Sequence, residues 1–252
     1  MADFTENFQN TLPNPSNSIA YDGSSDSSNA GFTAGPGYAS VQVTSKFKTM
    51  MNQTNSGTLV ARSKAAQSFE VSISYNPLTE DEFNILYGFL LQKQGMLKPY
   101  LVPLPQYDDP KDNTLATHSP EIEFQVGRDT LTTGYSAGVT QMFIDSSGYD
   151  SSTDGQLRPG DMFNITDASN SNHTKAYKIT RVETNADYTG TRPDLDELKI
   201  SFVPPLQKAV SDNSVIKYKN PTIKVVSGSD DISYTLGNNN LYSFSLKAKE
   251  VQ

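Results

Sequence analysis

The sequence predicts a mainly β protein with one amphipathic α-helix. Apolar and polar residues alternate in many short segments, turn-forming residues separate nearly all of these segments, and one stretch alone has a clear helical period. The 252 residues include 16 Gly and 14 Pro, with 35% apolar and 19% charged residues. Because helical patterns do not alternate with the strands, we expect an antiparallel sandwich or barrel rather than a parallel α/β sheet.

Composition excludes several classes of protein. The chain has no Cys, which rules out disulfides, thiolate metal sites and Cys nucleophiles. Its net charge of −8 argues against sequence-independent binding to nucleic acid, because that binding depends on Lys and Arg at the phosphates. No apolar run is long enough to cross a membrane, and residues 1–10 lack the basic and apolar regions of a signal peptide. We therefore expect a protein that is made in the cytoplasm and is not inserted into a membrane.

Residues 1–40 are predicted to form a flexible N-terminal arm. They are rich in Ser, Asn, Gly and Pro and contain no Lys or Arg, so they cannot build a core alone. The arm nevertheless carries aromatic side chains that we expect to contact a neighbouring subunit: Phe4, Phe8, Tyr21, Phe32 and Tyr38. On this view, deleting residues 1–40 weakens assembly and leaves the monomer folded. The alternative is a tail whose aromatic residues have no partner.

Strands and a helix follow the arm. Alternation in residues 41–47 and 69–75 predicts half-buried strands, and a turn at 55–57 leads to a short apolar stretch at 58–62. A helix is predicted over residues 80–94, because Thr79 and Glu82 form a capping box and Gly95 supplies the C-terminal stop. Its core stripe, which would pack inward in any fold, consists of Phe83, Leu86, Tyr87 and Leu90.

Most of the sequence after the helix is predicted to form strands. Residues 98–105 contain several Pro and suit an edge strand or a strap. Further strands are predicted at 122–126, 139–145, 161–166, 176–183, 198–203, 214–218, 222–226, 232–236 and 241–248. The last of these alternates apolar and polar residues and could return to the first sheet.

Nothing in the sequence nominates a catalytic, cofactor or metal site. His118 and His173 lie in polar segments and are predicted to be solvated loop residues. The Asp-rich segments 108–112 and 145–154 lack the spacing of a calcium loop and are predicted to be solvated turns. Phosphate-binding and zinc-protease motifs are missing, and no pair of carboxylates is set apart by an apolar flank. We expect no cofactor and no enzymatic activity.

The order of features between residues 40 and 107 resembles a known family. Alternating strands lead to Pro77-Leu78-Thr79-Glu80-Asp81-Glu82-Phe83, a single helix ends in 89–95, and an extended strand at 101–104 follows. This order resembles the hub domain of bacteriophage distal tail proteins and related minor tail or baseplate-hub proteins. The resemblance implies a tail-tube-like β-sandwich with one flanking helix, repeated around an axis to form a ring.

The C-terminal half resembles a second module of such proteins. Leu157-Arg158-Pro159-Gly160-Asp161, followed by the alternating segments 163–165 and 177–182, is similar to a small β-barrel found in tail and baseplate proteins. The expected domains are therefore the arm, a hub sandwich made of 41–126 and 218–252, and an inserted β-barrel at 127–217.

The resemblance implies a structural virion protein of the phage tail tip, joining the tail tube to the host-recognition apparatus. It implies a homo-hexamer or trimer ring, other tail proteins (tube, hub and fibre) as partners, and passage of DNA through the ring without specific binding. From the net charge we expect an acidic lumen, along which DNA would slide. Two alternatives remain open: a carbohydrate- or receptor-binding module that displays Tyr and Asn on loops such as 146–156, and a polysaccharide-cleaving enzyme.

Overall fold

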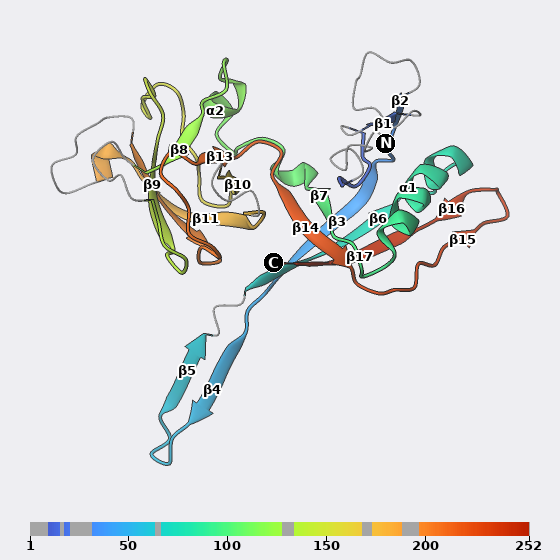
Figure 1. The fold of residues 1–252 in the computed structure, drawn as a ribbon, viewed down its shortest axis with the longest axis horizontal. Coiled ribbons are helices and arrows are strands. Elements are labelled where there is room, and N and C mark those ends of the chain that lie inside the picture. The colour runs from blue at the N-terminus through green and yellow to red at the C-terminus, as the bar shows by residue number, and fades with distance from the viewer. Residues whose placement is uncertain are drawn as a thin grey trace, which may run out of the picture. The chain divides into compact units, whose positions relative to one another are not determined.

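The computed structural model describes residues 10–15, 18–20, 32–63, 67–127, 134–167, 173–187 and 197–251. The chain divides into two compact units, each described separately below. The sheet unit comprises Met1–Lys46, Ser68–Pro103 and Ile223–Gln252, and the barrel unit comprises Phe47–Gln67 and Leu104–Thr222. The described residues are mainly β, with one long helix and a closed barrel, which confirms the predicted fold class (Figure 1).

The sheet unit is built on one five-stranded sheet. Its strands lie in the order β3 (Tyr38–Lys46), β6 (Ser68–Tyr75), β17 (Ser245–Glu250), β14 (Thr222–Ser227) and β7 (Tyr100–Pro103). β6 pairs antiparallel with both β3 and β17, and β14 pairs antiparallel with β17. The expected return of the last strand to the first sheet is thus confirmed. β7 lies at an edge, as its Pro residues predicted.

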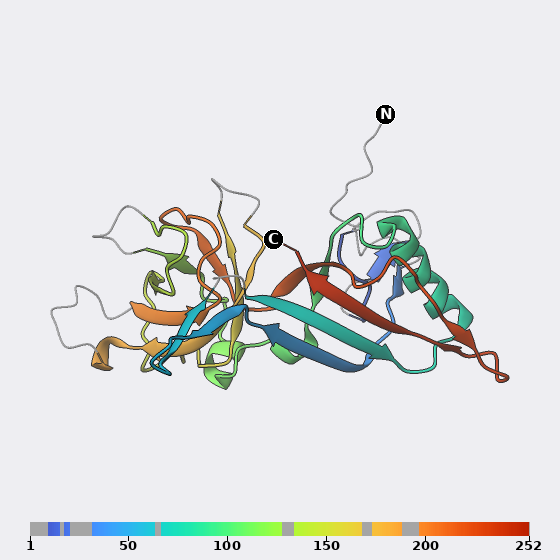
Figure 2. The ribbon, with the colours of Figure 1, turned by 90° about the horizontal axis from the view of Figure 1, so that it is seen from below.

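Alternation along β6 gives the sheet one apolar and one polar face. Phe69, Val71, Ile73 and Tyr75 are buried, while the residues between them are half-buried and polar. Helix α1 (Glu80–Lys93) packs on the apolar side, burying Phe83, Leu86, Phe89 and Leu90, and its Phe89 ring meets the Tyr100 ring of β7 edge to face (Figure 2). One helix and one sheet therefore share a single core.

Both ends of α1 follow the sequence prediction. The capping box is present: the amide and the hydroxyl of Thr79 each donate to the Glu82 carboxylate at 2.9 Å. The helix ends at Lys93, one residue before the predicted end, because Gln94 already adopts the left-handed conformation. Gly95 follows at φ 64°, and a Cβ there would lie 2.7 Å from an oxygen of Asp230, so no larger residue fits.

Two small ladders complete the sheet unit. β1 (Ser18–Ala20) pairs with β2 (Phe32–Ala34), and β15 (Thr235–Leu236) pairs with β16 (Tyr242–Ser243). The strand predicted at 232–236 is therefore shorter than expected. The strand predicted at 241–248 is divided at Phe244 between β16 and β17.

The described part of the predicted N-terminal arm packs on its own chain. Leu12 is fully buried and its amide donates to the Leu101 carbonyl at 2.8 Å, while the Leu101 amide donates to Asn10 at 2.6 Å. The Asn10 side chain accepts a hydrogen bond from the buried Lys93 at 3.0 Å. Because this segment extends the edge of β7, deleting residues 1–40 would remove part of the fold. We therefore expect the truncated monomer to be less stable than the full chain.

The barrel unit contains a closed barrel of antiparallel strands. Their order is β10 (Met162–Thr166), β11 (Ala176–Glu183), β12 (Leu198–Val203), β9 (Gln141–Asp145), β8 (Phe124–Val126) and β13 (Val215–Lys217). Its core includes the fully buried Phe124, Phe163, Tyr177 and Phe202. Short helices flank it: η1 (Pro105–Tyr107), α2 (Asn113–Thr117) and η2 (Asn185–Asp187).

The barrel begins earlier than the predicted boundary at 127. β8 closes the barrel between β9 and β13, and Leu115 of α2 belongs to the barrel core, so the unit extends from Leu104 to Thr222. The sequence placed 104–126 and 218–222 with the hub because β8 and α2 are short and give little periodic signal.

The Arg158-Pro159-Gly160-Asp161 turn is fixed by two buried carboxylates. Asp161 accepts the amides of Arg158 and Lys111 at 2.8 and 3.0 Å. Asp112 caps α2 through the amides of Thr114 and Leu115, and its other oxygen accepts two hydrogen bonds from the Arg158 guanidinium at 2.7 and 3.0 Å. Burial alone would raise the pKa of Asp112, but these hydrogen bonds outweigh it and lower that pKa. The charged residues of the Arg158-Pro159-Gly160-Asp161 turn therefore have a structural role, which is to hold this turn and the start of α2 in place.

His173 is buried, so its prediction as a solvated loop residue is wrong. Only 6% of the residue is exposed, and its Nε2 lies 2.8 Å from the Tyr177 hydroxyl inside the unit. The polar residues around His173 in sequence gave no sign of this contact. Burial lowers the pKa of His173 below 6.5, although the charge of Asp167 acts in the opposite direction.

Removing the Thr79 hydroxyl should destabilise the sheet unit. Thr79→Ala loses a hydrogen bond of the capping box and should lower the free energy of unfolding by about 1 kcal/mol. Urea denaturation of this variant and of Thr79→Ser, which keeps the hydroxyl, provides the comparison. Equal stability of the Ala and Ser variants would contradict this role of Thr79.

Acid should destabilise the fold through His173. Since burial favours the neutral ring, the contribution of His173 to stability is present above its unfolded pKa and is lost as the pH falls below about 6.5. In an NMR titration the His173 resonance, assigned by its loss in His173→Asn, should have a midpoint below 6.5. A midpoint above 6.5 would refute the assigned effect of burial.

Candidate functional site

A two-stranded β-hairpin is the candidate functional site. Strands β4 (Thr49–Gln53) and β5 (Leu59–Ser63) pair only with each other among the described strands, in a register that places Met51 opposite Ala61 and Gln53 opposite Leu59 (Figure 1). The connecting turn is ordered: the Gly57 amide donates to Thr54 at 2.8 Å, and Gly57 adopts φ 82°. The turn signal at 55–57 is thus confirmed.

The hairpin exposes large apolar side chains on both of its faces. The exposed fractions are 67% for Phe47, 55% for Met50, 64% for Met51, 60% for Leu59 and 52% for Val60. The register places Met51 and Leu59 on one face and Met50 and Val60 on the other. Exposed apolar groups gathered in this way make the hairpin a candidate interaction surface.

The hairpin is also basic. Within Phe47–Gln67 the charged residues are Lys48, Arg62 and Lys64, whereas the chain as a whole has a net charge of −8. An isolated two-stranded hairpin is at best marginally stable in water, because neither face is covered. Apolar faces and opposite charge together suit this hairpin to docking on an acidic surface of another subunit.

The open edge of the five-stranded sheet is a second place for contact. β3 is the terminal strand of that sheet, and no described strand pairs with its outer edge along Tyr38–Lys46. Such an edge offers unpaired backbone groups to a partner strand. Lys46, which forms an ion pair with Glu70 at 2.6 Å, places a charge at its end.

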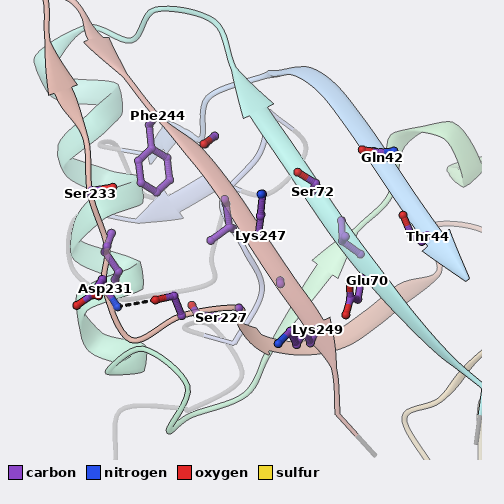
Figure 3. Close-up of a pocket in the computed structure, with 17 residues that line it drawn as sticks. Gln42, Thr44, Glu70, Ser72, Ser227, Asp231, Ser233, Phe244, Lys247 and Lys249 are labelled. Atoms are coloured by element: carbon purple, nitrogen blue, oxygen red, sulfur yellow. Dashed lines mark hydrogen bonds between the residues drawn. The ribbon is translucent and has the colours of Figure 1, made fainter. Parts of the chain in front are cut away.

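A hollow of about 450 Å³ lies on the polar side of the sheet (Figure 3). Its polar lining comes from β3, β6 and β17, where the register aligns Gln42 with Ser72 and Lys247, and Thr44 with Glu70 and Lys249. The segment 227–233 forms its other wall. Acidic and basic groups are mixed here, and Phe244 is the aromatic residue among those that line it, so the hollow offers no broad platform for sugar stacking.

The residues that the sequence predicted for inter-subunit contacts and for the helix core lie in different environments. Phe4, Phe8 and Tyr21 lie outside the described residues, and Phe32 begins β2. Tyr38 begins β3 and meets the Tyr75 ring of its own sheet edge to face at 5.6 Å. In the helix stripe, Phe83, Leu86 and Leu90 are buried as expected, while Tyr87 is half-buried and stacks on Phe83 at 5.2 Å.

The candidate groups for chemistry are used in local structure. His118 contacts the Pro120 carbonyl at 3.0 Å and the Asp154 carboxylate at 3.3 Å. Asp150 accepts the amide and hydroxyl of Ser152, which fixes the turn. Within the described part of the chain, no group of three or more His, Asp or Glu residues is arranged to hold a metal ion. No helix in that part has the length and apolar character needed to span a membrane.

Sequence reasoning missed the hairpin as a site. Its signal was present in Met50-Met51 and Leu59-Val60, where adjacent apolar residues must lie on opposite faces of any strand. A strand pair with large apolar side chains on both faces cannot bury both of them against one sheet or helix of its own chain.

No protein-family model matches the sequence, and no curated protein matches it.

Proposed function

We propose that the chain is a structural, non-enzymatic subunit of a bacteriophage tail tip, of the distal tail or baseplate-hub type. Copies assemble into a hexameric or trimeric ring that joins the tail tube to the host-recognition apparatus. The exposed apolar hairpin is the main support for this proposal. Its apolar side chains are exposed to water in the single chain, and covering them with another subunit would lower the free energy. Tube, hub and fibre proteins are the further partners, and the virion is the place of action.

The architecture supports the same function. Strands β3 and β6, then helix α1, then the edge strand β7 follow one another in the order on which the resemblance to distal tail proteins rests. An assembly subunit needs contact surfaces rather than a reaction centre. The hairpin and the open edge of β3 supply two such surfaces.

The polar face of the sheet limits where an acidic lumen could lie. Lys247, Lys249 and Lys224 share this face with Glu70, so it is not acidic. If DNA passes through the ring along an acidic surface, that surface comes from other parts of the chain.

The carbohydrate-binding alternative gains no support from the loop expected to display Tyr and Asn. Tyr149 is 3% exposed, its hydroxyl donates to the Gly155 carbonyl at 2.6 Å, and its ring packs edge to face on Phe124. A buried Tyr cannot stack on a sugar ring. We therefore keep the assembly function as the single proposal.

Charges placed on one hairpin face should prevent assembly. In Met51→Glu/Leu59→Glu both side chains point to the same face, and the loss of two apolar contacts should weaken self-association at least about 100-fold. Light scattering at tens of micromolar, with negative-stain images of the same peak, measures the effect. The wild type should form a ring and the variant should be a folded monomer.

Thr180→Glu/Lys217→Glu, at exposed barrel positions, is the matched control and should assemble normally. A wild-type protein that stays monomeric at every concentration tested would contradict a self-assembling ring. A double-Glu hairpin variant that forms the same ring would contradict the role of the hairpin.

A further inference from the structure

The large apolar side chains that are exposed outside the hairpin lie at the C-terminal end of α1 and in the segment that contacts this helix. Their exposed fractions are 51% for Leu91, 45% for Met96, 70% for Leu97, 47% for Tyr234 and 50% for Leu236. We call these residues the helix-side patch. With the hairpin, they account for all the exposed large apolar residues of the described chain.

The two parts of this patch are held together by contacts along α1. At the C-terminal end of the helix, the Met96 amide donates to the Asp230 carboxylate at 3.0 Å. Toward its N-terminal end, the Tyr234 ring lies 4.7 Å from that of Phe83 and 5.4 Å from that of Tyr87. The segment 230–234 therefore runs along the helix, and Leu236 follows it in β15 (Figure 1).

Acidic groups border the helix-side patch. Glu80 and Asp81 are exposed in the first turn of α1, and Asp230 and Asp231 are exposed beside its last turn. Of the two Lys residues in this region, Lys98 is exposed and offsets part of the acidic charge, whereas Lys93 is buried. The patch thus has the opposite charge to the hairpin, whose charged residues are all basic.

We propose that the hairpin of one copy docks on the helix-side patch of the next copy. This inference rests on the proposed self-assembly and adds the surface that receives the hairpin. Contact between two hairpins would bring like basic charges together, and contact between two patches would bring like acidic charges together. The hairpin-to-patch contact joins apolar groups with opposite charges at its border.

Such a contact is heterologous, because two different surfaces of the same chain meet. Each bound copy then presents a free hairpin and a free patch, so association continues until a ring closes or a filament grows. The charge pattern therefore favours a ring or filament over a two-fold dimer.

Cross-linking between single-Cys variants tests the contact, since the natural chain has no Cys. Met51→Cys places a thiol on the hairpin, Leu97→Cys on the patch, and Lys217→Cys on the exposed barrel surface as a control. Variants are mixed in pairs under assembly conditions with a short bis-maleimide. We expect the cross-linked dimer in the mixture of the Met51 and Leu97 variants, at least about tenfold above each variant alone and above mixtures with the control.

Charge exchange gives a second readout. Asp231→Lys should weaken assembly roughly tenfold, and Arg62→Glu should do the same. The double variant Asp231→Lys/Arg62→Glu, in which every chain carries both substitutions, should recover assembly. Lys217→Asp serves as the control and should not rescue Asp231→Lys.

The outcomes separate this inference from the proposed function. A ring that forms without the hairpin-to-patch cross-link and without charge rescue would overturn the docking surface and leave the assembly function standing. A hairpin-to-hairpin cross-link would overturn it as well. If the wild type does not self-associate and its hairpin binds another tail protein instead, both the ring and the docking surface are wrong.

Discussion

The pairing of β6 with β17 is the interaction on which the sheet unit depends. It joins segments far apart in the chain, and the Phe69 amide also donates to the Glu250 side chain across a sequence separation of 181 residues. Because β3 pairs with β6 and β14 pairs with β17, loss of this central ladder would divide the sheet into two pieces, neither with a covered face. The core that α1 covers therefore exists only after the C-terminal strand has been made and added.

The sequence predicted those elements in which the local pattern and the tertiary environment agree. β6 alternates because one face of its sheet is covered, and the limits of α1 follow from Thr79 and from the chain reversal at Gly95. β12 matches its predicted limits because burial alternates regularly along it, and β11 matches them although its burial is irregular and a register shift lies between Ile179 and Arg181. Such elements can be predicted from the sequence because their apolar residues recur with the period of the strand or the helix.

Other features depend on contacts that no local pattern reports. His173 sits among polar residues in sequence yet is buried beside Tyr177, and Leu12 belongs to a polar arm yet fills the core at β7. The hairpin differs again, because its apolar residues are not buried in the chain at all. Sequence periodicity relates side chains to the core of the same chain, so it does not identify apolar side chains that stay exposed on the surface. The candidate site was for that reason less predictable than the fold.

The barrel unit enters and leaves the sheet unit through neighbouring strands. Its main segment starts after β7 and ends at the start of β14, and these two strands are adjacent in the sheet. This main segment therefore needs only two attachment points on the sheet, while residues 47–67 of the same unit are inserted separately between β3 and β6. The register of the sheet is set by pairings within the sheet unit, so the length of the segment between β7 and β14 can change without shifting any of these pairings.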